Sequence, residues 1–404
     1  MEGGATVGRL TEVAVVGAGP AGSALAIACR QAGLAVRIYD HGSRTRRQDH
    51  LVELTANGTR VLHALGLKQD LAAVARFPAF ATTRSARTAF LLTQRPLGAF
   101  SEARYGAPCC LIRGEDLRAL LTAAVRRSDI PVESSAVSNI DTATGTLILA
   151  DGRRVAHLAV AVASGRPADP ATPDLAALVA PRSWSVPERP TLIRARTFRE
   201  RPDREHDRFL NTWLGDGFLV LERPDAAHEA AGQPVELFLV SPARRPERTA
   251  SEAIRSLLRG CHPHLARLAE NLEADYEDVP VAEVAEHWQT GRVALLGGAA
   301  HAAPAYPELE PSAALEDAWI LSRMMERWEE APHQGFAEYE RFRRSRAKRL
   351  RAFAGEELST NTVPQGLARW QRNLRWSLSG RFLPEIAMQR LDWLYGYDCI
   401  RGFA

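Results

Sequence analysis

The sequence predicts an α/β fold that opens with a Rossmann-like dinucleotide-binding unit. Val13 to Val16 form a short run rich in β-branched residues, which is typical of a buried strand. The turn Gly17-Ala18-Gly19-Pro20-Ala21-Gly22 follows at once, and Ala24 to Ala32 favours a helix that Gly33 would end. This order of strand, glycine-rich turn and helix is the start of a nucleotide-binding βαβ unit.

An acidic residue completes this pattern. A second apolar run ends at Tyr39, and Asp40 follows it, about twenty residues after the glycines. Gly17 permits the tight turn, Gly19 lets the backbone approach a pyrophosphate, and Gly22 lets the helix pack on the strand. Asp40 can accept a hydrogen bond from a ribose hydroxyl, so the segment predicts an adenine dinucleotide as ligand.

Composition excludes several other classes of protein. The 404 residues are 46% hydrophobic, and 51 Lys and Arg balance 48 Asp and Glu, which argues against nucleic acid as a main partner. The apolar stretch from Val13 to Ala28 is too short and too rich in glycine and proline for a membrane span. Five cysteines without paired spacing predict neither a disulfide framework nor a metal site, so we expect a cytoplasmic protein; they are Cys29, Cys109, Cys110, Cys261 and Cys399.

Further segments match one pattern along the whole chain. They are Gly17 to Gly22, Thr55 to Leu62, Ile112-Arg113 with Asp116-Leu117, Gly291 to Gly297 with Ala299-Ala300-His301, Leu315 to Ala318, and Leu391 to Asp398. On these segments the chain resembles the group A FAD-dependent monooxygenases, or aromatic hydroxylases, and most closely their salicylate hydroxylase-like branch.

The resemblance implies a GR2-type FAD-binding fold with an inserted β-sheet substrate domain and C-terminal helices. The FAD-binding domain would be discontinuous, over residues 1–70, 105–180 and 281–355. Residues 71–104 and 181–280 would form the substrate domain, and 356–404 a helical cap. It also implies that FAD is held by Gly17, Gly19, Ala21, Gly22, Asp40, Arg113, Gly297 and His301, although for His301 we favour a structural role.

Two departures from the family remove a carboxylate. The family has an Asp-Gly pair after a mid-chain strand, whereas here Ser164-Gly165 follows Ala159 to Ala163. The family's late segment reads Gly-Asp, and that aspartate accepts from the ribityl chain of the flavin, but here Gly298 stands in its place.

Two further departures add bulk or charge near the expected flavin ring. The stretch from Pro307 to Ser312 replaces a glycine-rich loop and brings Glu308 and Glu310, whose charge would oppose that of a reduced flavin. Asp49-His50-Leu51 replaces a small Gly-Ala-Gly stretch. We therefore expect FAD binding to be weakened or lost, with NAD(P)H used only if FAD binds.

A pocket without flavin would receive new polar groups, and these are the catalytic candidates. They are Asp49, His50 and Glu53 from one wall and Tyr306, Glu308 and Glu310 from the other, with His301 beside them. A histidine and a carboxylate with separated pKa values could perform general acid and base catalysis. This favours a non-redox cyclase, isomerase or dehydratase of secondary metabolism, for example antibiotic biosynthesis, with a hydrophobic polyketide-like or aromatic substrate. For His50 and Glu310, a surface position without catalytic duty carries equal weight.

Two alternatives stay open. One is a functional FAD- and NAD(P)H-dependent monooxygenase, a hydroxylase or epoxidase, that tolerates the substitutions. The other is a catalytically silent binding partner. Under each of these hypotheses we expect a monomer or homodimer without membrane or nucleic-acid contacts.

We expect the basic and histidine-rich segments to have structural roles. The helix predicted from Gly335 to Leu358 carries many arginines, including Arg343 and Arg346, and we expect them to form a solvated face rather than a phosphate site. His262 and His264 lack neighbouring carboxylates in the sequence, so a loop with incidental histidines is preferred to a metal site.

Overall fold

The computed structural model of the protein describes most of the chain. It covers residues 11–42, 50–165, 172–181, 190–199, 208–225, 232–277, 284–301, 309–364, 366–382 and 388–402. Within the described residues, no helix has the length and apolar character needed to cross a membrane.

The nucleotide-binding half is built on a six-stranded sheet with the order β17-β18-β11-β1-β2-β7. Neighbours are parallel except for β17, which pairs antiparallel with β18. Residues Val13 to Val16 are buried, as a strand covered on both faces requires. The strands are β1 (Glu12–Val16), β2 (Ala35–Tyr39), β7 (Val132–Glu133), β11 (Ala159–Val162), β17 (Gln289–Thr290) and β18 (Val293–Leu295).

Helices cover this sheet. α1 packs against both α5 and α8, and α2 also packs against α8. Two small sheets complete this half, one of β8, β9 and β10 and one of β3 and β6. The helices are α1 (Pro20–Gln31), α2 (Ala56–Ala64), α3 (Lys68–Val74), α5 (Gly114–Arg127) and α8 (Glu310–Arg327), and the strands are β3 (Leu51–Leu54), β6 (Cys110–Arg113), β8 (Val137–Asp141), β9 (Thr146–Leu149) and β10 (Arg154–Ala156).

The second half is a seven-stranded sheet with the order β16-β12-β15-β14-β13-β4-β5. Its pairs are antiparallel except β4 with β13. One face packs on α6 (Ala250–Leu258) and α7 (Pro263–Leu268) through an apolar cluster that includes Trp213. The strands are β4 (Phe80–Ser85), β5 (Leu91–Pro96), β12 (Thr191–Arg199), β13 (Phe209–Leu214), β14 (Leu219–Pro224), β15 (Gln233–Ser241) and β16 (Glu273–Tyr276).

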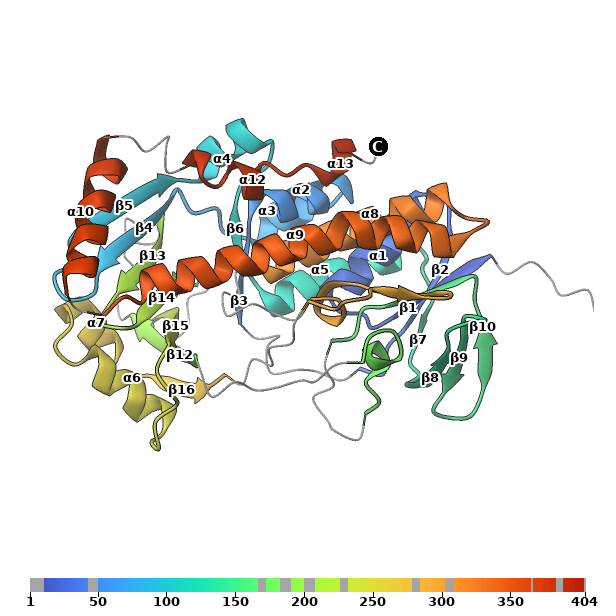
Figure 1. Ribbon diagram of the computed structural model, residues 1–404, viewed down its shortest axis with the longest axis horizontal. Helices are drawn as coiled ribbons and strands as arrows, with labels where there is room; N and C mark the ends of the chain where they lie inside the picture. The colour runs from blue at the N-terminus through green and yellow to red at the C-terminus, as the bar shows by residue number, and fades with distance from the viewer. Residues whose placement is uncertain are drawn as a thin grey trace, which may run out of the picture.

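One long helix connects the two halves. α9 (Pro332–Asn361) has 30 residues, which gives a length of about 45 Å. Figure 1 shows it running from the six-stranded sheet, where it lies beside α8, to the seven-stranded sheet. α10 (Leu367–Phe382) then packs on β5. The chain returns through α12 (Asp392–Tyr395), which contacts α4 (Gly98–Tyr105), and α13 (Cys399–Gly402), which packs against α2 and α8 (Figure 1). This architecture confirms the predicted α/β fold, whereas the domain boundaries proposed above stay a prediction.

Candidate functional site

The turn between β1 and α1 forms a cradle for an anion. Gly17 has a φ of +107°, and a Cβ at Gly22 would lie 2.0 Å from the carbonyl oxygen of Gly17, so both positions require glycine. Gly19 is the N-cap of α1 without a side-chain cap, and nothing lies within 4 Å of its would-be Cβ. The first turn of α1 therefore has no side-chain cap at Gly19 and leaves open space beside it, as a phosphate site requires.

Asp40 lies directly beside this turn. Its Oδ1 accepts from the backbone N–H of Ala18 at 3.3 Å, and its Oδ2 is 3.8 Å from Nη2 of Arg118. The carboxylate therefore keeps its predicted place next to the turn, where a ribose hydroxyl could reach it. Arg113, predicted to hold the cofactor, instead pairs with Asp225 at 2.8 Å and with Glu115 at 3.3 Å, so its cofactor role stays a prediction.

Three parallel strands end at the same edge of the six-stranded sheet. The register places Val16, Val162 and Leu295 side by side at the ends of β1, β11 and β18. The loops that follow approach closely, since a Cβ on Gly165 would lie 4.0 Å from the carbonyl carbon of Gly298. In open α/β sheets this edge forms the ligand crevice. The described residues therefore fit the nucleotide part of FAD.

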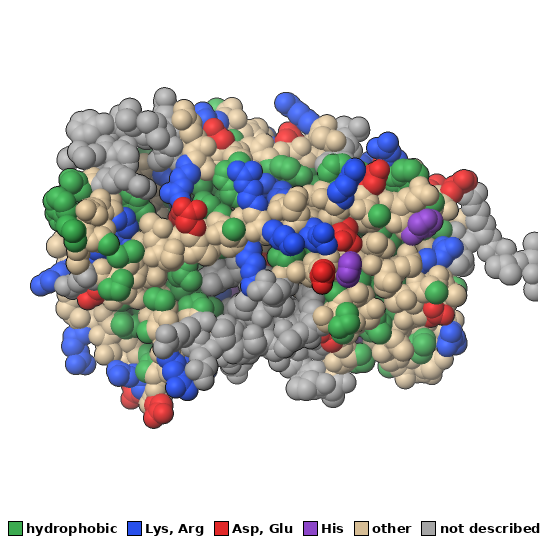
Figure 2. Space-filling view, viewed as in Figure 1, with side chains coloured by type: hydrophobic (Ala, Val, Ile, Leu, Met, Phe, Trp, Pro, Cys, Tyr) green, Lys and Arg blue, Asp and Glu red, His purple; other side chains and the backbone are tan. Residues whose placement is uncertain are grey.

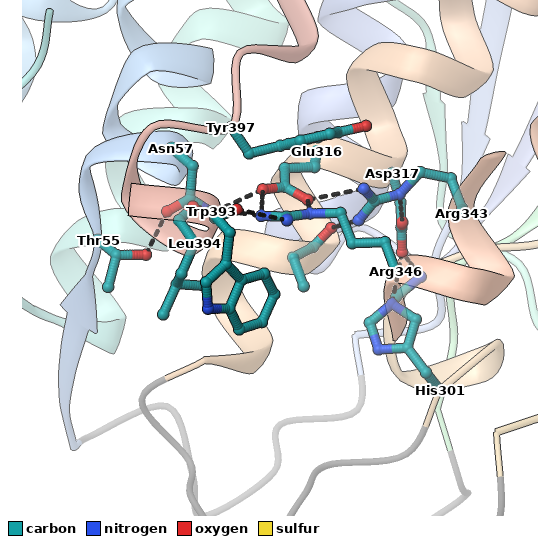
Figure 3. Close-up of polar contacts among 12 residues, drawn as sticks. Thr55, Asn57, His301, Glu316, Asp317, Arg343, Arg346, Trp393, Leu394 and Tyr397 are labelled. Atoms are coloured by element: carbon teal, nitrogen blue, oxygen red, sulfur yellow. Dashed lines mark hydrogen bonds and ion pairs between the residues drawn. The ribbon is translucent and has the colours of Figure 1, made fainter. Parts of the chain in front are cut away.

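A buried network supports the crevice from behind. Asp317, at the centre of α8, accepts from the backbone N–H of Gly297 at 3.0 Å and from Nε2 of His301 at 2.6 Å. Nε of Arg343 on α9 donates to Oδ1 of Asp317 at 2.6 Å. The loop after β18 is thus fixed to both helices, and His301 contacts Asp317 within it (Figure 3). Whether His301 also contacts the cofactor stays a prediction.

Glu316 extends the network to α2 and the C-terminal segment. It accepts from Nδ2 of Asn57 at 2.6 Å and from two nitrogens of Arg346 at 2.7 Å each, and Nη1 of Arg343 lies 2.7 Å away. Arg346 also donates to the carbonyl of Trp393 and packs on the ring of Tyr397, 3.7 Å from its centroid. Glu316 and Asp317 on α8 therefore form a structural junction with α2, with α9 and, through Arg346, with the C-terminal segment.

The expectation of a wholly solvated arginine face is wrong for Arg343 and Arg346. The side chain of Arg343 is fully buried and that of Arg346 is 8% exposed, because both face the acids of α8. Figure 2 shows other Lys and Arg side chains over α9 on the surface of the molecule. Arg343 and Arg346 are three residues apart, so they lie on the same face of α9. This shared face, together with the adjacent acids Glu316 and Asp317, is the sequence signal that could have indicated the buried pairs.

The two buried acids make stability depend on pH. Burial alone would raise the pKa of Glu316 and of Asp317, but the charges of Arg343 and its neighbours outweigh burial and hold both pKa values below the ordinary range. A depressed native pKa stabilises the fold above the unfolded-state value of about 4, and this stabilisation is lost as pH falls through the native value.

We therefore expect the urea midpoint to fall steeply on acidification below about pH 4. In Asp317→Asn this part of the slope should be smaller, because one of the titrating carboxyls is gone. The measurement is urea denaturation of both proteins between pH 7 and pH 2.5. Equal slopes in the two proteins would contradict the assignment.

His50 lies at the junction of the two halves. Its Nδ1 is 3.8 Å from Oε2 of Glu236 on β15, and its side chain is partly exposed. It lines a cavity of about 530 Å³ together with Arg113, Arg194 and Tyr276. This volume suits a small-molecule site.

Of the catalytic candidates within the described residues, Glu53 and Glu310 do not line that cavity. Glu310 begins α8 and lines a separate cavity of about 20 Å³ with His301 and Arg351. Its Oε1 is 3.2 Å from the position of a Cβ on Gly298. Asp49, Tyr306 and Glu308 lie outside the described residues. A shared acid–base pair of His50 and Glu310 therefore gains no support from the pockets.

Ion pairs across the junction were not foreseen from the sequence. Glu53 on β3 lies 3.3 Å from Arg223 on β14. On the seven-stranded sheet, Arg194 pairs with Glu236 and, at 2.6 Å, with Glu277. Nothing in the local sequence marks these residues as partners, because strand pairing brings Arg194 to its acids and the contact between two separate sheets brings Glu53 to Arg223.

His264 is a second unforeseen case. Its Nε2 lies 2.9 Å from Oε1 of Glu222, which is fully buried and also accepts from Nε1 of Trp213 at 2.8 Å. His262 accepts from the backbone N–H of His264 at the start of α7. The expected incidental loop histidines thus cap a helix and pair with a buried acid.

Comparison with known proteins agrees with this geometry. The profile of the FAD binding domain family matches residues 10–145. The 3-amino-4-hydroxybenzoate 2-monooxygenase of Streptomyces cremeus is 28% identical and is covered over 96% of both chains. The 6-hydroxynicotinate 3-monooxygenase of Pseudomonas fluorescens is 25% identical over 87% of this chain and 93% of its own. Over most of its length the chain is therefore similar to FAD-dependent aromatic monooxygenases.

Solved structures share the fold of this chain. Klebsiella pneumoniae HpxO, complexed with FAD and uric acid, superposes with a TM-score of 0.76 at 19% identity, covering 94% of this chain and 97% of its own. A salicylate hydroxylase substrate complex gives a TM-score of 0.71 at 17% identity over 96% of both chains. The similarity therefore extends over both sheets and the helices that join them.

Proposed function

We propose that the protein is an FAD- and NAD(P)H-dependent monooxygenase of a small aromatic or heteroaromatic substrate. The observation that carries the proposal is the intact nucleotide cradle, formed by the Gly17 to Gly22 turn and Asp40, at the head of a chain that matches monooxygenases along its length. The relatives favour this activity over the non-redox reaction that the departures suggested.

The protein's own residues would bind and orient the reactants. The N–H groups at the start of α1 would hold the pyrophosphate, and Asp40 would accept from the adenosine ribose. Bound FAD would take a hydride from NAD(P)H and activate oxygen. The substrate site that we favour is the cavity between His50 and the seven-stranded sheet, because its volume of about 530 Å³ suits a small aromatic molecule.

A non-redox enzyme is the second candidate. It is favoured by the loss of carboxylates at two positions on the crevice, where Ser164-Gly165 and Gly298 stand. Against it, His50 and Glu310 line different cavities. A catalytically silent partner has no structural observation in its favour.

The purified protein decides between these candidates. We expect a yellow protein with bound FAD, and NAD(P)H oxidation that increases when a hydroxylated aromatic acid is added. The measurements are the visible absorption spectrum and the decrease in absorbance at the nicotinamide band. A colourless protein that does not bind added FAD would exclude the monooxygenase and leave the non-redox candidate.

A further inference from the structure

Gly298, just after β18, has no side chain, and Glu310 at the start of α8 places its side chain beside it. Gly298 follows β18 and faces Gly165 across the crevice, 4.0 Å away as measured from the Gly165 Cβ position. Glu310 is distant in sequence, yet its Oε1 lies 3.2 Å from the point where a Cβ on Gly298 would stand. The carboxylate of Glu310 therefore lies in the space that a short acidic side chain on residue 298 would need.

The position of Glu310 on its helix favours a negative charge. Glu310 is in the first turn of α8, an 18-residue helix, and the N-terminal end of a helix stabilises negative charge. The loop that carries Gly298 is held in place by the bond from Gly297 N to Asp317 Oδ2 at 3.0 Å. Both ends of the contact are thus anchored to α8.

The crevice then has an acid at each of two points. Asp40 lies beside the turn before α1, and Glu310 lies beside the loop after β18. An ionised carboxylate only accepts hydrogen bonds, so its natural partner on a ligand is a hydroxyl group. FAD carries hydroxyl groups on its ribose and on the sugar-alcohol chain that leads to its ring.

We propose that Glu310 is a cofactor-positioning residue whose carboxylate accepts a hydrogen bond from the sugar-alcohol chain of FAD, in place of a side chain at position 298. This inference rests on the proposed function. It reverses the role that the sequence suggested for Glu310, because a group that only repelled the flavin would weaken binding rather than support it.

The two roles give opposite results in an equilibrium titration of each variant with FAD, followed by quenching of flavin fluorescence. We expect Glu310→Ala to weaken FAD binding by about 10- to 100-fold, the range for a hydrogen bond to a charged group. Glu310→Gln keeps an acceptor oxygen, so its loss should be smaller. Glu326→Ala, at the exposed end of the same helix, is the matched control and should bind like the wild type.

A sharper test moves the carboxylate from residue 310 to residue 298. Gly298→Asp alone should also weaken FAD binding, because its Cβ would already crowd Glu310 at 3.2 Å and two carboxylates would share one space. The double variant Gly298→Asp with Glu310→Ala should bind FAD more tightly than either single variant. Thermal melting of each apoprotein shows whether a change in affinity reflects loss of fold.

The outcomes separate this inference from the proposed function. If the wild type binds FAD and Glu310→Ala binds it equally well or more tightly, the inference is overturned while the monooxygenase proposal stands. If the wild type does not bind FAD, both fail together. Additive losses in the double variant would also overturn the shared-position argument.

Discussion

Replacing Arg343 by alanine is expected to lower the free energy of unfolding by about 3–5 kcal/mol, the range for removing one partner of a buried ion pair. The guanidinium is fully buried, and its loss would leave Glu316 and Asp317 with less compensation for their burial. The loop that carries Gly297 and His301 is bonded to Asp317, so FAD affinity should fall as well. Urea denaturation measures the first effect and FAD titration the second.

Arg344→Ala on the same helix is the control. Its side chain is 35% exposed and pairs with Glu340 at 3.2 Å, so we expect a change of about 0–1 kcal/mol. Arg343→Lys should not restore wild-type stability, because a single ammonium cannot reproduce the fork that contacts two carboxylates. A loss below about 1 kcal/mol in Arg343→Ala would contradict the role assigned to this network.

Replacing Gly22 by alanine is expected to weaken FAD binding by about 100-fold, since hydrogen bonds from the displaced N–H groups to a charged phosphate contribute about 1.5–3 kcal/mol each. The new Cβ would lie 2.0 Å from the carbonyl oxygen of Gly17, so the turn or α1 must shift. Overpacking of this kind also costs about 1–3 kcal/mol of stability. Titration with FAD and thermal melting report the two effects separately.

Gly355→Ala is the matched glycine control. Gly355 lies on α9 with nothing within 4 Å of its would-be Cβ, and alanine is favoured over glycine in a helix interior by about 1 kcal/mol. Its FAD affinity should be unchanged. Wild-type FAD affinity in Gly22→Ala would show that this turn does not hold the cofactor.

Local patterns were sufficient where the chemistry is local. The strand before Gly17, the turn to Gly22 and the acid at Asp40 lie within one βαβ segment, so spacing alone predicted their arrangement, and the structure places them as expected. The sequence predicts acidic repulsion of a reduced flavin at Glu308 and Glu310. The structure describes only Glu310, which lies against Gly298.

Long-range contacts could not be predicted in the same way. The sequence predicts Arg343 to be one of many surface arginines. Its burial could not be predicted, because it depends on how α9 packs on α8. Glu222 and His264 are 42 residues apart, and only the packing of α7 on the seven-stranded sheet brings them together.

The sequence by itself determined the nucleotide-binding fold, because glycine backbone geometry and a nearby acid are properties of a short segment. The tertiary structure alone decided which charges are buried and which share a space. Pairing between distant helices sets these, and it made Glu316 and Asp317 a structural junction, separated His50 from Glu310, and brought Glu310 to the position that Gly298 leaves open.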